Sequence, residues 1–225
     1  MGSDGRRHPD YTRIVLRPVG SGLPLGFFSF AVGMLLLGCL ALGWIPEDEQ
    51  RQVGMLLMAF VFPLELVATV FAFLARDTLG ATTLGLFTTS WLALGWMSVD
   101  APPGSASVAV GIYLFGFSAA VLLLATLSTL GKPLFSILLL LAATRAVLAG
   151  AWNAGAPDEL LTISGVVALV LTAVAMYGGL ALGLEDARHR EVLPLFRRGA
   201  AGEAFEGYEQ QLERLEAEPG VRQQL

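Results

Sequence analysis

Long apolar runs separated by short polar breaks dominate the pattern of this chain. Six of these runs are long enough to cross a bilayer, since one crossing takes about 20 residues of α-helix. They cover Pro24–Trp44, Gln52–Ala75, Leu79–Met97, Ser107–Leu130, Leu134–Ala151 and Leu160–Leu184. Prolines and glycines, which favour turns, mark most of the breaks. The pattern predicts an all-α membrane protein with six transmembrane helices.

Composition and the placement of polar residues support this fold class. Charged residues make up only 15% of the chain and hydrophobic residues 55%, whereas soluble domains carry about 25% charged residues. We therefore divide the chain into a tail (1–22), a six-helix domain (23–195) and a charged tail (196–225). A stripe of apolar residues at helical spacing predicts that the second tail is partly helical. That helix could face a partner or a neighbouring subunit, and fraying in solvent is the alternative.

The placement of lysine and arginine predicts the orientation in the membrane. Of the 14 such residues, twelve lie before the first run, after the sixth run, or in the second-to-third and fourth-to-fifth links. The opposite side carries only Arg51. Since cytoplasmic loops are enriched in these residues, we expect both termini in the cytoplasm and a multi-pass protein of the plasma membrane. Three tryptophans lie at the expected outer ends of runs, where such rings prefer the interface: Trp44, Trp96 and Trp152.

The motifs of common enzymes and metal sites are missing from the sequence. It contains no GxSxG, P-loop or HExxH pattern. The single cysteine, Cys39, lies in an apolar run, and the two histidines, His8 and His189, lie outside the six runs. We therefore expect no enzyme activity, no metal, no cofactor and no nucleic-acid partner. The outer loops are too short to hold a catalytic domain, so transport is the leading function by elimination.

Two ionisable residues lie well inside apolar runs, Glu65 in the second and Arg145 in the fifth. A charge at the bilayer centre costs at least about 2.5 kcal/mol, so such residues usually face a cavity or each other. Either they line a path for a solute or a proton, or they form a structural salt bridge. Since they lie at different depths, we do not assume a direct pair.

Hydroxyl side chains gather in the third run. They are Thr78, Thr82, Thr83, Thr88, Thr89 and Ser90. They could line a wet path, with Thr82 as our candidate, or each could bond the carbonyl four residues earlier in its own helix. Small residues also recur at four-residue spacing, which we interpret as close helix packing.

Short motifs in a fixed order resemble the acetate uptake transporter family, the bacterial acetate–succinate permeases and their fungal relatives. The family opens its first helix with Asn-Pro-Ala-Pro-Leu-Gly followed shortly by Phe, and this chain has Ser-Gly-Leu-Pro-Leu-Gly at 21–26, then Phe30. The family's Gly-Asn-Thr-Phe-Gly is matched by Arg-Asp-Thr-Leu-Gly at 76–80, before a third helix that reaches Trp91. Further matches include Tyr113 and Tyr177. The motif residues that agree are Pro24, Leu25, Gly26, Thr78, Gly80 and Tyr113.

The resemblance implies a homohexamer in which each six-helix protomer holds its own path, narrowed by aromatic side chains. It matches Phe30 to one aromatic of this constriction. The family's tyrosine in the third helix falls on Phe87, and its glutamine in the second helix falls on Glu65. Arg145 has no counterpart in the family pattern. A carboxylate in place of glutamine would repel an anion unless it is protonated or paired.

Together these features predict a transporter or channel for acetate or a similar small monocarboxylate, or its acid, with proton linkage. The expected path residues are Phe30, Glu65, Thr82, Phe87, Trp91, Arg145 and Tyr177. One alternative keeps the fold and carries a neutral solute such as urea or an amide. The other is a membrane scaffold that transports nothing and recruits partners through its C-terminal tail.

Overall fold

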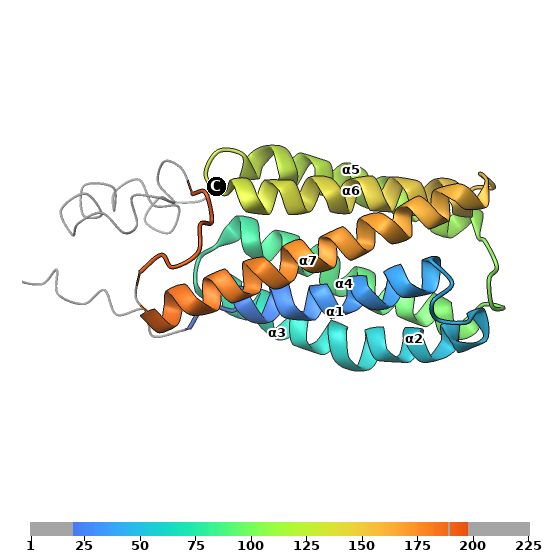
Figure 1. The fold of residues 1–225 in the computed structure, drawn as a ribbon, viewed down its shortest axis with the longest axis horizontal. Coiled ribbons are helices and arrows are strands. Elements are labelled where there is room, and N and C mark those ends of the chain that lie inside the picture. The colour runs from blue at the N-terminus through green and yellow to red at the C-terminus, as the bar shows by residue number, and fades with distance from the viewer. Residues whose placement is uncertain (1–19, 189, 198–225) are drawn as a thin grey trace, which may run out of the picture.

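Six helical rods lie side by side in the computed structural model, which describes residues 20–188 and 190–197 (Figure 1). The second rod is continuous, because η2, α2, η3 and α3 follow one another directly. The elements are α1 (Leu23–Ala41), η2 (Glu47–Glu49), α2 (Gln50–Leu56), η3 (Leu57–Val61), α3 (Phe62–Leu74), α4 (Thr78–Asp100), α5 (Val108–Ser128), α6 (Pro133–Asn153) and α7 (Asp158–Arg188). Each predicted run therefore falls on one rod.

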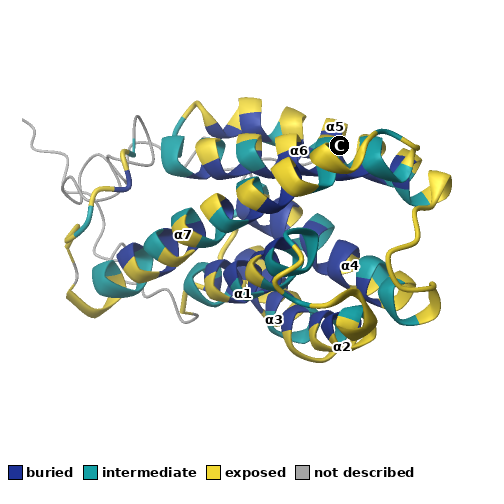
Figure 2. Cartoon of the chain, turned by 45° about the vertical axis from the view of Figure 1, so that its right-hand side comes forward, coloured by how far each residue is buried: buried dark blue, intermediate teal, exposed yellow. Residues whose placement is uncertain are grey.

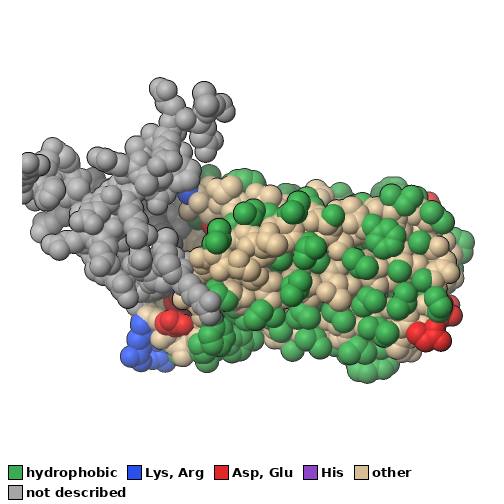
Figure 3. Space-filling model, turned by 90° about the horizontal axis from the view of Figure 1, so that it is seen from above, with side chains coloured by type: hydrophobic (Ala, Val, Ile, Leu, Met, Phe, Trp, Pro, Cys, Tyr) green, Lys and Arg blue, Asp and Glu red, His purple; other side chains and the backbone are tan. Residues whose placement is uncertain are grey.

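Five of these rods are long and apolar enough to span a membrane, and the all-helical membrane class is confirmed. The exception is the hydroxyl-rich α4, so the count of six spans stays a prediction. On the face drawn in Figure 3, acidic and basic side chains lie near the two ends and hydrophobic side chains cover the length between them. Exposed residues follow the outward faces of the helices (Figure 2), and many are large and apolar. Such a surface suits contact with lipid.

Glycine allows close approach where pairs of helices cross. The backbones meet at Gly54 and Gly95 between α2 and α4, where a Cβ added at Gly54 would lie 2.6 Å from the Gly95 carbonyl oxygen. Gly111 on α5 meets Gly150 on α6 in the same way. Because lipid supplies no hydrophobic drive between helices, tight packing of this kind holds a membrane bundle together.

The start of α1 and the end of α7 lie at the same end of the bundle (Figure 1). We call this the terminal end and the other the distal end. The α3–α4 and α5–α6 links are also at the terminal end, where Lys132 Nζ lies 2.6 Å from Asp77 Oδ2. The start of α1 and the end of α7 at one end agree with an even number of crossings, while the side of the membrane on which they lie stays a prediction.

A short turn joins α3 to α4 and fixes how the third rod begins. Arg76 adopts a left-handed conformation with φ of 60°. Its N–H donates to the Phe73 carbonyl, and the Asp77 N–H donates to the Ala72 carbonyl, which together form a Schellman cap. The resembling family has glycine at position 76, and glycine favours this conformation. Asp77 then caps α4 by accepting from the Gly80 N–H at 3.0 Å.

Candidate functional site

A cavity lies among four helices towards the terminal end of the bundle. Its wall is mostly apolar and aromatic, and Glu65 and Thr83 supply the polar side chains among the described residues that line it. The lining residues are Gly26, Phe27 and Phe30 of α1, Glu65 of α3, Thr83, Leu84 and Phe87 of α4, and Phe135 and Leu138 of α6. A mostly apolar wall with a few polar groups is the usual composition of a small-molecule site.

Aromatic rings continue from this cavity towards the distal end. The Phe30 ring meets Phe87 edge-on at 5.0 Å between centroids and Trp91 at 5.9 Å. Phe87 in turn meets Phe117 of α5 at 5.0 Å, with the rings at 86°. Edge-to-face contacts of this kind are favourable and directional. The predicted path residues Phe30, Phe87 and Trp91 therefore lie together in one cluster beside the cavity.

Glu65 is completely buried, with 0% of its surface exposed. Neither carboxylate oxygen has a hydrogen-bond partner in the described part of the chain. The Trp91 indole lies near the carboxylate, yet its N–H does not reach hydrogen-bonding geometry, and Thr83 Oγ1 is also without a partner among these residues. Buried polar atoms without partners are costly. These three groups can therefore bond a polar solute or water, and the carboxylate can also bind a proton.

A π-helical turn precedes Glu65 and explains how the second rod presents it. In η3 the Phe62 N–H donates to the Leu57 carbonyl, five residues back, in place of the usual four. Pro63 follows at once, and proline cannot donate a backbone hydrogen bond within a helix. One extra residue in the turn rotates the later side chains of the rod about its axis. Such bulges are frequent at functional sites. Pro63 is the sequence signal for this feature.

Arg145 is also buried, with 8% of its surface exposed. It lies on α6 seven residues after Leu138, which lines the cavity. Seven residues are almost two full turns, so the two residues share one stripe of the helix. Arg145 Nε has no partner among residues 20–188 and 190–197, and no ion pair joins Arg145 to Glu65 there. The stripe places Arg145 distal to the cavity.

Some hydroxyls of α4 bond carbonyls of their own helix, and others face a neighbouring helix or the cavity. Thr89 Oγ1 donates to the carbonyls of Gly85 and Leu86 on its own helix, and Thr88 bonds Thr69 of α3 at 3.1 Å. Thr82, the predicted path residue, is exposed on the outside of α4. Its neighbour Thr83 lines the cavity in its place. A spacing of four residues from Phe87 could have identified Thr83 from the sequence.

The two tyrosines of the family resemblance lie away from the cavity. Tyr177 Oη donates to the Pro194 carbonyl at 2.9 Å and so ties the segment after α7 back onto that helix. Tyr113 packs against Phe117 at 6.1 Å between centroids, at the edge of the aromatic cluster. Sequence reasoning also missed Phe27, Leu84, Phe135 and Leu138, because nothing marks these residues as different from other apolar residues in their runs.

The motif residues serve mainly to build the walls of the site. Pro24 and Leu25 lie in the first turn of α1, and Leu25 packs against the small cluster of Ala68, Ala72, Ala81 and Leu84. An added Cβ at Gly26 would lie 2.7 Å from Leu84 Cδ2, so glycine lets α1 approach α4 beside the cavity. Thr78 begins α4, and Gly80 leaves room for the capping carboxylate of Asp77.

Replacing Gly178 by alanine is expected to reduce the space in the cavity. The new Cβ would lie 2.5 Å from Phe27 Cε1, so the ring must move. Overpacking of this kind costs about 1–3 kcal/mol. We expect a several-fold loss of solute flux in liposomes. Gly183→Ala on the same helix is the control, because no described atom lies within 4 Å of its added Cβ. Normal flux with lowered thermal stability would show that Phe27 moves away from the cavity.

The fold and the cavity define the chain as an all-helical membrane protein with an aromatic-lined cavity inside its helix bundle. It belongs to the GPR1/FUN34/yaaH family, whose model matches residues 3–192. This match confirms the family resemblance found in the sequence. No curated protein sequence matches the chain.

A solved structure described as that of the bacterial acetate channel SatP has a similar fold. It is 18% identical to this chain, with a TM-score of 0.71, and the match covers 79% of this chain and 99% of that one. At this identity the likeness concerns the fold, and it agrees with the family assignment.

Proposed function

We propose that this protein moves acetate or a similar small monocarboxylate, or its acid, across the plasma membrane, with linkage to protons. The sequence motifs that resemble the acetate uptake transporter family support this class of cargo, and the fold is similar to that of a bacterial acetate channel. The observation that carries the proposal is the cavity beside Phe30, Phe87 and Trp91, with the unpartnered Glu65 on its wall. The protein would act without enzyme chemistry.

The proposed path runs through one protomer. Arg145, on the distal side, would draw the carboxylate inward by charge attraction. The methyl group would then pass the rings of Phe30, Phe87 and Trp91, which exclude bulk water. Thr83 and Glu65 would offer the polar contacts in the cavity, with Glu65 binding and releasing a proton as the acid passes. Thr82 and Tyr177, also predicted to line the path, would act only in another conformation, since Thr82 is exposed and Tyr177 contacts Pro194.

Uptake of labelled acetate into liposomes, with and without a pH gradient, tests this function directly. We expect saturable acetate entry that accelerates when the side of entry is acidified. Urea is the comparison solute, because a channel for neutral solutes would carry it at least as well. A scaffold protein would carry neither solute. It would retain partners in a pull-down that depends on the C-terminal tail, most of which (198–225) lies outside the described residues.

Thiol labelling tests the proposed orientation with both termini in the cytoplasm. A cysteine placed in the loop 101–105, in a Cys39→Ser background, should react with an impermeant reagent added to intact cells. A cysteine in the C-terminal tail should react only after the membrane is opened. The reason is that twelve cations lie before the first run, after the sixth run, or in the two links on that side, against Arg51 on the other. The reverse labelling pattern would contradict this orientation.

We also propose a homohexamer with a separate path in each protomer. The family resemblance supports this state, and the many exposed apolar residues of the single chain leave faces available for other copies. Native mass spectrometry in mild detergent should give a mass six times that of the 23.8 kDa chain. Monomers or dimers alone would contradict this assembly, and so would a structure with an open polar pore on the central axis.

A further inference from the structure

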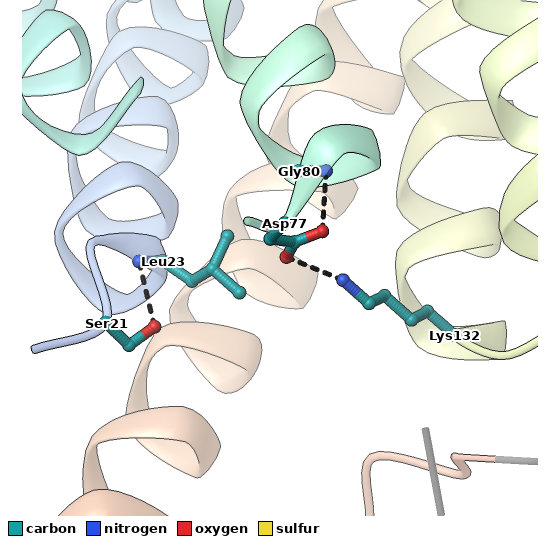
Figure 4. Close-up of polar contacts among 5 residues, drawn as sticks. All are labelled: Ser21, Leu23, Asp77, Gly80 and Lys132. Atoms are coloured by element: carbon teal, nitrogen blue, oxygen red, sulfur yellow. Dashed lines mark hydrogen bonds and ion pairs between the residues drawn. The ribbon is translucent and has the colours of Figure 1, made fainter. Parts of the chain in front are cut away.

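An ion pair bridges the terminal ends of two of the helices that line the cavity. Asp77 directly precedes α4, and Lys132 directly precedes α6 (Figure 4). The Lys132 Nζ lies 2.6 Å from Asp77 Oδ2, although the two residues are 55 positions apart in the chain. The pair is partly buried, with 33% of the lysine and 20% of the aspartate side chain exposed.

Two residues that line the cavity lie close to this pair along α4 and α6. Phe135 is in the first turn of α6, two residues after its start, and Thr83 is five residues after the start of α4. At 1.5 Å per residue these cavity residues lie only about 3 and 8 Å along their helices. The ion pair therefore links the terminal ends of α4 and α6 on the terminal side of the cavity.

The bonding of Asp77 shows how the pair is held. One carboxylate oxygen accepts the Gly80 N–H at 3.0 Å, and the other accepts from Lys132 (Figure 4). The aspartate is thus fixed to the start of α4, whereas the lysine reaches it on a flexible side chain. An ammonium group has three donors. Lys132 can therefore exchange one carboxylate for another without any change in the cap of α4.

We propose that Lys132 is a carboxylate-binding residue at the terminal mouth of the cavity, and that Asp77 occupies it when no substrate is there. A small carboxylate leaving the cavity displaces Asp77 from the lysine, which separates α4 from α6 at the mouth. Reformation of the ion pair joins the two helix ends again. This inference rests on the proposed function, because it takes the solute to be a carboxylate.

Two variants separate this role from a purely structural one. Asp77→Asn keeps a good capping residue for α4 and removes the charge that holds Lys132. Lys132→Met breaks the same pair and also removes the cation. Both variants should open the mouth, but only Asp77→Asn keeps Lys132, the group that can bind a carboxylate there. Arg76→Gln is the control, since it also changes the net charge by one unit, one residue from Asp77.

Cysteine labelling measures the opening. With Thr83→Cys in a Cys39→Ser background, an impermeant thiol reagent is applied to membrane vesicles with the terminal side outward. Both pair variants should raise the rate of labelling, by about two- to fivefold for a partly exposed ion pair, and the control should not. Sodium acetate should then slow labelling in Asp77→Asn and leave Lys132→Met unaffected.

Acetate flux from the terminal side gives an independent measurement that does not need the cysteine. The half-saturating concentration should fall in Asp77→Asn and rise in Lys132→Met. A shift in the same direction in both variants, or unchanged labelling with reduced thermal stability, would overturn the inference. A wild-type protein without acetate flux would refute the proposed function alone, because protection of the introduced thiol by acetate through Lys132 does not require transport.

Discussion

Arg145→Leu is expected to lower acetate uptake by about tenfold or more. A hydrogen bond to a charged group contributes about 1.5–3 kcal/mol, and each 1.4 kcal/mol is a factor of about ten. In the proposed path the guanidinium attracts the anion before it reaches the aromatic rings, and leucine cannot replace that attraction. Urea uptake should change much less, because a neutral solute gains little from the charge. Initial rates for both solutes in the same liposomes measure the difference.

A structural role for Arg145 predicts a different outcome. Arg51→Leu is the matched control, since Arg51 is exposed near the start of α2, at the distal end. Because Arg145 forms no ion pair within the described part of the chain, leucine breaks no such pair, and the melting temperature should not fall. Equal losses of acetate and urea uptake, together with a lower melting temperature, would show that the arginine only supports the fold.

Glu65→Gln is expected to flatten the dependence of uptake on pH while leaving uptake itself measurable. Glutamine has nearly the same shape, and it is the residue of the resembling family at this position. It cannot bind or release a proton in the range of the assay. The rate of a step controlled by one titrating carboxyl changes by up to about tenfold per pH unit. This holds on the side of the pKa where the active form of the carboxyl is scarce. We expect the variant to change by less than about twofold over the same range.

Uptake measured across a series of external pH values tests this expectation. Asp100→Asn removes a carboxylate from the exposed end of α4 and serves as the control. A variant profile that follows the wild type would show that another group, or the acid in solution, sets the pH dependence. Thermal stability should not fall, because the Glu65 carboxylate has no hydrogen-bond partner to lose within the described residues.

The family and the positions of the helices could be read from the sequence. Each apolar run falls on one rod, with ends that differ by a few residues. The reason is that a backbone in lipid must satisfy its hydrogen bonds within its own helix, so the extent of each helix is written in a continuous segment. Turn chemistry is also local, as Asp77 and Gly80 show at the start of α4.

The inward face of each helix could not be read in the same way. Lipid and the interior of a membrane protein are both apolar, so a helix that faces both carries no clear periodic contrast. For this reason Phe135 and Leu138 could not be told from their neighbours by hydropathy, although both line the cavity. The π-helical turn before Glu65 shifts the register again.

The sequence by itself determined the class of protein, its family and the positions of the rods. It also singled out Glu65 and Arg145, because they are ionisable residues inside apolar runs. Only the tertiary structure decided that these two do not pair within the described residues and that Asp77 pairs with Lys132. Contacts between residues 55 positions apart depend on how the rods pack together. That packing follows from side-chain shape and close backbone approach, which hydropathy along the chain does not record.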